Sequence, residues 1–209
     1  MRKLALILAV CLCLLPTLAA CGGGEAVTAE EIFPIARTLI ERSVIVNTAL
    51  IGDGVPTGSE AFGEYVYADR AWEDAHNIHS VEDMLSLTAS VYTTQIYNIL
   101  YQDVIIKDGV LPPDYQNRAK TDTNPLGGLL VYRDREGWYK NTTHEYLFDT
   151  MVLTAAGENY ATVTITVRIT PDGKTPQERQ ITLPFVRNQS GWLCDKLTYV
   201  AYDASSVNQ

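Results

Sequence analysis

The stretch Tyr160–Thr170, YATVTITVRIT, decides the fold, because apolar and polar residues alternate along its whole length. The branched aliphatic residues from Val163 to Ile169 fall on one face, and the threonines and Arg168 fall on the other. This period of two is typical of an antiparallel strand with one face on a core and one toward solvent. The sequence therefore predicts a half-buried antiparallel strand here.

Other strands are expected around this one. The pattern predicts strands at 145–153, 179–187 and 192–200, and a hairpin of 128–133 with 137–140. Pro184 cannot donate a ladder hydrogen bond, which predicts a sheet edge or a bulge at that position. A short strand is also expected at Tyr65-Val66-Tyr67, after a glycine-rich loop at 52–58.

Two helices are expected before this run of strands. Thr28-Ala29-Glu30-Glu31 reads as a capping box, and helical apolar spacing continues to about Ile51. Ser80 caps a second amphipathic helix, which ends near Gln102 to Val104. Helices followed by a meander predict an α+β fold, in which N-terminal helices pack on a curved antiparallel sheet.

The N-terminus has the layout of a secretory signal. A basic Met1-Arg2-Lys3 precedes an apolar run at 4–15, which is shorter than the roughly 20 residues that cross a bilayer. Leu18-Ala19-Ala20-Cys21 resembles a bacterial lipobox. That resemblance implies cleavage between Ala20 and Cys21 and a lipid with palmitate-like acyl chains on Cys21. An ordinary secreted protein stays open as the alternative.

These features divide the chain into a signal peptide (1–20), a lipidated cysteine with a flexible glycine spacer (21–27), one domain (28–203) and a tail (204–209). Loss of Arg2 and Lys3 changes the net charge from −9 to −11, which disfavours nucleic acid as a partner. After processing and acylation, Cys194 is the remaining free cysteine. We therefore expect no disulfide, and we expect Cys194 to be a buried, inert thiol.

Two family resemblances sharpen the expected fold and role. The closing segment ITLPFVR (181–187) and NQSGWLCD (188–195) resembles the final strand pair of the NTF2-like superfamily, which implies a cone-like curved sheet wrapped over helices. The layout of the whole domain is similar to that of the IseA-type inhibitors of cell-wall DL-endopeptidases. It shares a first helix, a glycine-rich loop at 52–63, the Tyr65–Tyr67 segment, a helix at 80–102 and a closing Gly191-Trp192. That family blocks a peptidase and does no chemistry itself.

The sequence carries no recognised catalytic motif, so we expect no enzymatic activity and no cofactor. The densest polar cluster is Asp69, Glu73, Asp74, His76 and His79, which we interpret as a solvated loop rather than a metal site. Tyrosines are frequent and suit a binding groove. The tentative partner-binding residues are Asp53, Tyr65, Tyr67, Asp69, Glu73 and Asp74.

We therefore expect a lipoprotein anchored on the extracytoplasmic face of the cell membrane, which acts as a non-enzymatic binding or regulatory module. Inhibition of a cell-wall peptidase is its specific form, with a cell-wall enzyme or another envelope protein as partner. Two alternatives stay open: an NTF2-like domain that binds a small molecule, with or without catalysis, and a structural component of the cell envelope.

Overall fold

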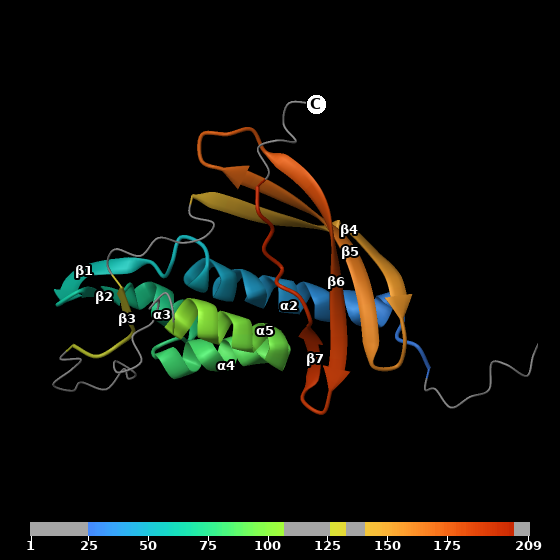
Figure 1. The fold of residues 1–209 in the computed structure, drawn as a ribbon, viewed down its shortest axis with the longest axis horizontal. Helices are drawn as coiled ribbons and strands as arrows, with labels where there is room; N and C mark the ends of the chain where they lie inside the picture. Colours follow the sequence, from blue (N-terminus) through green and yellow to red (C-terminus); the bar gives the residue numbers. More distant parts are fainter. Residues whose placement is uncertain (1–24, 107–125, 133–140, 203–209) are drawn as a thin grey trace, which may run out of the picture.

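The computed structural model describes residues 25–106, 126–132 and 141–202. The predictions for the leader (1–20), for cleavage after Ala20 and for lipidation of Cys21 lie outside these residues. The predicted strand at 137–140 and the tail at 204–209 also lie outside them. In the described part, helices pack against a curved antiparallel sheet, and a smaller sheet lies at the far end of the first helix (Figure 1). The predicted α+β class with helices on a curved sheet is confirmed.

The large sheet is built as the alternating stretch predicts. Its four strands are all antiparallel and follow the order β4 (Thr142–Ala156), β5 (Tyr160–Pro171), β6 (Gln177–Asn188) and β7 (Gly191–Cys194). Along β5 every second residue is buried, and Val163 and Ile165 are fully inaccessible to solvent. The threonines between them are half-buried on the opposite face.

Pro184, where an edge or a bulge was predicted, lies on the inner strand β6, next to the point where β7 ends. It pairs with Thr162 of β5 on one side of β6. On the other side, β7 ends at Cys194, opposite Phe185. The carbonyl of Pro184 accepts a hydrogen bond from Asp195 N on that side (2.9 Å). Since the N and C=O of one strand residue face the same way, the position of the missing N–H of Pro184 faces Asp195, just beyond the end of β7.

The first helix, α2 (Ala29–Leu50), begins at the predicted capping box. Thr28 N donates to the Glu31 carboxylate (2.8 Å), and Glu31 N donates to Thr28 Oγ1 (3.4 Å). The bonds that the Glu31 carboxylate accepts from Thr28 N and Thr28 Oγ1 lower its pKa. One residue earlier, Val27 N donates to Gly157 O (3.2 Å), which ties the entry of the chain to the β4–β5 turn. The buried face of α2 then packs on β4, β7 and α4.

The prediction of a single second helix is wrong. It is broken into α4 (Val81–Val91), α5 (Thr94–Ile99) and the π-helical η1 (Leu100–Ile106). Ser80 is the N-cap, as expected, but Tyr92 has extended dihedral angles (φ −112°, ψ 150°). At this break Tyr92 forms a parallel bridge with Cys194, and Thr93 N donates to Cys194 O (3.1 Å). Backbone pairing with Cys194 thus takes the place of helical hydrogen bonds at this break.

The small sheet contains β1 (Thr57–Phe62), β2 (Tyr65–Ala68) and β3 (Leu130–Tyr132) in that order, all antiparallel. The predicted strand at Tyr65–Tyr67 is confirmed as β2. The predicted loop at 52–58 is too long, because β1 begins at Thr57. The predicted hairpin at 128–140 is corrected in part: β3 forms, but within the described residues its partner is β2, with Val131 opposite Val66.

The segment interpreted as a solvated loop is a helix, α3 (Arg70–His76), capped by Asp69. Asp69 Oδ1 accepts from Trp72 N (2.9 Å), and Asn77 ends the helix in a left-handed conformation. Glu73 is 1% exposed, so the solvated interpretation is wrong for this carboxylate.

The predicted final strand at 192–200 is also too long. β7 ends at Cys194, and the chain beyond it crosses to α2 and β4 without forming a strand. Thr198 is fully buried there, and its hydroxyl lies 2.7 Å from Ser43 Oγ and accepts from Asn47 Nδ2 at 2.6 Å. Tyr92 donates to Asn47 Oδ1 (2.9 Å) and Tyr146 donates to Thr198 O (3.1 Å). These side-chain bonds take the place of a sheet ladder in holding the C-terminal segment.

Candidate functional site

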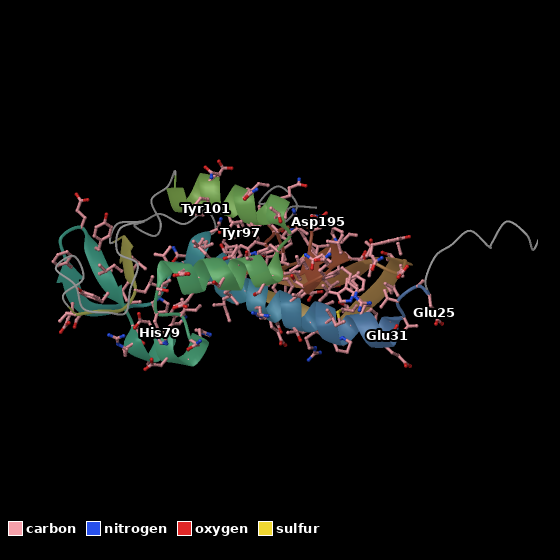
Figure 2. All side chains as sticks on the ribbon, turned by 90° about the horizontal axis from the view of Figure 1, so that it is seen from below. Glu25, Glu31, His79, Tyr97, Tyr101 and Asp195 are labelled. Atoms are coloured by element: carbon pink, nitrogen blue, oxygen red, sulfur yellow. The ribbon has the colours of Figure 1, made fainter. Side chains whose placement is uncertain are left out.

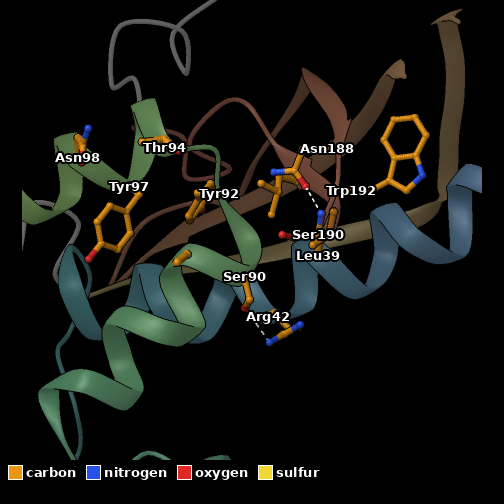
Figure 3. A pocket seen from close by; sticks show the side chains of 12 residues that line it. Leu39, Arg42, Ser90, Tyr92, Thr94, Tyr97, Asn98, Asn188, Ser190 and Trp192 are labelled. Carbon is orange, nitrogen blue, oxygen red and sulfur yellow. Dashed lines mark hydrogen bonds between the residues drawn. The ribbon is translucent and has the colours of Figure 1, made fainter. Parts of the chain in front are cut away.

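A cleft of about 560 Å³ lies between the helices and the β6–β7 hairpin (Figure 3). Its volume falls in the range of about 300–1,000 Å³ that is usual for small-molecule sites. The helices supply one group of lining residues: Leu39, Arg42, Ala89, Ser90, Tyr92, Thr94, Tyr97 and Asn98. The hairpin supplies the other: Asn188, Ser190, Trp192 and Leu193. Amides, hydroxyls and aromatic rings therefore share this lining with a few aliphatic side chains.

Arg42 is the single charged residue among the described residues that line the cleft. Its Nη2 donates to Ser90 Oγ at 2.7 Å (Figure 3). The Ser90 hydroxyl in turn donates to Leu87 O at 2.6 Å. Ser90 therefore acts as an acceptor toward Arg42 and holds the half-buried guanidinium in place.

One wall of the cleft is the turn that joins β6 to β7. Ser190 N donates to Asn188 Oδ1 (2.8 Å), an Asx-type bond that closes the turn. Gly191 follows with φ +122°, in the region that favours glycine over other residues. Trp192, next along β7, is half-buried and pairs with Arg187. The Gly-Trp pair of the sequence thus turns the chain and then supplies an aromatic side chain to the wall.

The opposite wall is the break between α4 and α5. Thr93 Oγ1 donates to Asp195 Oδ1 at 2.6 Å, which fixes the start of α5 to the chain that leaves β7. Tyr97 on α5 stacks on Tyr101 with ring centroids 6.0 Å apart, and Figure 2 shows both rings on this side of the molecule, on α5 and η1. The helix break, which the apolar spacing does not predict, therefore forms one wall of the cleft.

The buried titratable groups near the cleft are held in their neutral forms. Burial raises the pKa of the Tyr92 phenol to about 12 and that of the Cys194 thiol to about 12. A thiol in that state is a poor nucleophile at neutral pH, and a phenol in that state is a poor base. The arrangement suits binding through neutral hydrogen-bonding groups and one arginine.

A second, smaller hollow of about 290 Å³ gathers three of the six predicted partner-binding residues. Tyr67, Asp69 and Glu73 line it, together with the glycines at 127 and 128. Glu73 Oε1 accepts from the buried Leu129 N at 2.5 Å, and Glu73 Oε2 pairs with Arg70 Nη1 at 2.8 Å. Both carboxylate oxygens are thus engaged within the protein, and the role of Glu73 is to hold the 127–129 backbone against α3.

The other three predicted residues do not join this hollow. Asp53 is exposed and accepts from Asn141 N (2.5 Å), which ties the loop after α2 to the start of β4. Tyr65 lies on β2 opposite Phe62. Asp74 is exposed on α3, 3.9 Å from His79 Nδ1. The predicted set is therefore divided among separate places.

The tyrosines do not share one groove either. Tyr92 and Tyr97 line the cleft, Tyr67 lines the smaller hollow, and Tyr146 belongs to the buried cluster around Thr198. Sequence reasoning missed the central residues of the cleft. Arg42 reads as one more exposed position of an amphipathic helix, and Asn188 and Ser190 read as ordinary turn residues. The Gly191-Trp192 pair was the one available signal.

Together, the fold and the cleft define an α+β protein with helices on an open curved sheet, consistent with the NTF2-like architecture, and with a polar cleft at one edge of that sheet. No family model matches this sequence, and no curated protein matches it. Within residues 25–106, 126–132 and 141–202, no helix is both long and apolar enough to cross a membrane. The same residues bring no three His, Cys, Asp or Glu side chains together as a metal site.

Proposed function

We propose that this chain is a lipid-anchored binding module on the outer face of a bacterial membrane, and that it holds a small polar ligand in the cleft without catalysing a reaction. The lipobox-like Leu18-Ala19-Ala20-Cys21 supports the anchor. Two acyl chains on one cysteine give stable membrane attachment.

The observation that carries the binding role is the chemistry of the cleft lining. Amides, hydroxyls and two exposed or half-buried aromatic residues, Tyr97 and Trp192, surround a space large enough for a ligand of several residues or sugar units. Carboxylates and histidines, the usual general acids and bases, do not occur among the described lining residues. Such a lining recognises shape and hydrogen-bond pattern, which is the work of a receptor or sensor.

A blocking substitution tests the site. Ala89 is exposed on α4 and lines the cleft, so Ala89→Trp fills the cleft without disturbing the core. Ser86→Trp, on an exposed position of the same helix outside the lining, is the matched control. A panel of neutral and charged polar compounds is screened by NMR chemical-shift changes. We expect hits that Ala89→Trp abolishes and Ser86→Trp retains; a panel without any cleft-directed hit rejects the proposal.

The anchor is tested separately by mass spectrometry of the protein isolated from its native membrane. We expect an N-terminal Cys21 that carries a diacylglyceryl group. A Cys21→Ser variant should remain unprocessed or be released to the medium. An unmodified Cys21 in a mature chain contradicts the anchor and leaves the binding role unaffected.

A second candidate is restraint of a cell-wall peptidase, which the IseA-type layout implies. The feature that favours it is the β1–β2 hairpin, which projects at the end of the molecule away from the large sheet (Figure 1). Five of the six β1 residues are exposed. Purified DL-endopeptidase activity should fall when the protein is added. Glu60→Arg on β1 should weaken that effect, and Glu41→Arg on α2 should not; unchanged peptidase activity rejects this candidate.

A further inference from the structure

Arg42 differs from Arg70 and Arg168 because no carboxylate pairs with it among the described residues. Arg70 pairs with Glu73, and Arg168 pairs with Glu145 and Glu178. Within the described residues, Arg42 has the Ser90 hydroxyl as its hydrogen-bond partner and no carboxylate at ion-pair distance. In a sequence with 25 acidic and 16 basic residues, carboxylates outnumber their possible partners. An arginine that lines a cleft and has no carboxylate partner among the described residues is therefore available to an acidic ligand.

The guanidinium is also presented in a fixed geometry. It is half-buried, and one of its N–H groups is taken by Ser90, whose own proton is committed to Leu87 O. A guanidinium has five N–H donors, so enough remain for a two-bond contact with one carboxylate. Partial burial strengthens such a contact, because water screens it less than it screens an exposed pair.

The remaining lining is neutral. Asn98 on α5 and Asn188 with Ser190 on the hairpin offer amide and hydroxyl groups on opposite walls, and Trp192 and Tyr97 offer aromatic surface (Figure 3). These groups suit a ligand that is polar but uncharged over most of its length. A ligand with several negative charges would find one cation and an acidic protein around it.

We propose that the cleft binds a small polar molecule through a single carboxylate, which Arg42 holds while the asparagines and Ser190 contact its neutral hydrogen-bonding groups. The carboxylate can belong to the C-terminus of a short peptide or to a sugar acid, since both offer the same chemistry. This inference rests on the proposed binding role of the cleft and names the ligand class for it.

The test uses three probes that differ in the charged group: N-acetyl-alanyl-alanine (the dipeptide probe), its C-terminal amide, and glucuronate. Binding is measured by NMR titration, with Asn188, Ser190 and Trp192 backbone signals as reporters. We expect the dipeptide to bind about tenfold or more tightly than its amide, because the amide lacks the negative charge and the second oxygen that a two-bond ion pair with Arg42 requires. Glucuronate distinguishes the two sources: its binding in place of the dipeptide assigns a sugar acid.

Arg42→Gln should remove the preference for the free carboxylate, so that the variant binds the dipeptide and its amide equally. Arg37→Gln is the matched control, because Arg37 lies on the same helix but stacks on the Phe148 ring, 4.5 Å from its centroid, outside the cleft lining. A second measurement needs no variant: added salt should weaken binding of the carboxylate probe and not of its amide, because counterions screen the ion pair.

The outcomes separate this inference from the proposed function. Equal binding of the dipeptide and its amide, with shifts at the reporters, overturns the carboxylate preference and keeps the cleft as a binding site. Binding of neutral panel compounds, with none of the three probes bound, likewise overturns the carboxylate preference and keeps the cleft as a binding site. If neither the probes nor the wider panel shift the reporters, the binding role itself falls.

Discussion

The two sheets of this protein are stabilised in different ways. The large sheet buries alternate aliphatic residues along β5, with Val163, Ile165, Val167 and Ile169 all fully inaccessible. The small sheet also buries apolar residues such as Leu130 and Val131, but a buried carboxylate adds to them, because Glu73 accepts from Leu129 N and pairs with Arg70. The first arrangement is readable from a short stretch of sequence, and the second requires residues 56 positions apart to meet. Alternating burial along a strand can therefore be predicted from the local sequence, whereas a hydrogen bond between a side chain and a distant backbone N–H cannot.

The largest expected effect lies in the large sheet. Phe185 on β6 is fully buried, and Phe185→Ala should lower the free energy of unfolding of the whole domain by about 3–5 kcal/mol through lost burial and the cavity that remains. Val152→Ala, at a position 53% exposed on β4, should change it by less than about 0.5 kcal/mol. Denaturant unfolding measures both. Similar losses from the two variants would contradict the assignment of the core to this face.

The small sheet should respond locally. Glu73→Ala leaves the buried Leu129 N–H without its acceptor, which costs about 1–3 kcal/mol. Amide hydrogen exchange should accelerate in β2 and β3 while β5 keeps most of its protection, because no hydrogen-bonded strand pair joins the two sheets among the described residues. The exposed neighbour Asp74→Ala is the control. Uniform acceleration in both sheets would mean that they open as one unit.

The smallest expected effect is a pH dependence at the start of the large sheet. Burial lowers the pKa of His144 below its usual value of 6.5, against the opposing hydrogen bonds to backbone oxygens of Val200 and Thr142. The unfolded state then binds the proton more readily, so the stabilisation is complete above about pH 6.5 and declines as the pH falls toward the lowered folded-state pKa.

His144→Gln tests this pH dependence, because an amide can still donate to Val200 O but does not titrate in this range. The loss of unfolding free energy on acidification from about pH 7.5 to about pH 5 should be smaller in the variant than in the wild type. Identical losses in the two proteins would assign the pH dependence to other groups.

The sequence predicted the elements whose pattern is local. The Thr28 capping box, the Ser80 cap and the β5 alternation all depend on neighbouring residues, and all are present. β1 was missed because five of its six residues are exposed, so no apolar alternation marks it. α3 was missed because it is seven residues long and its charged residues read as solvated.

The helix break and the cleft depend on contacts that no local pattern reports. Apolar spacing continues through Tyr92, whereas its extended conformation follows from pairing with Cys194, 102 positions later. The cleft then combines side chains from α2, α4, α5 and the β6–β7 turn. Single residues such as Arg42 gain their role from this assembly, which is why the candidate residues chosen from sequence clusters lay elsewhere.

The bond from Val27 N to Gly157 O has a consequence for orientation. Five residues separate Val27 from Cys21, so the chain between them reaches at most about 20 Å. If Cys21 carries the proposed lipid, this length keeps the β4–β5 turn within about 20 Å of the bilayer. The 22-residue α2 then extends about 33 Å from this point toward the small sheet. If the molecule stands upright on that anchor, the β1–β2 hairpin is the part farthest from the bilayer.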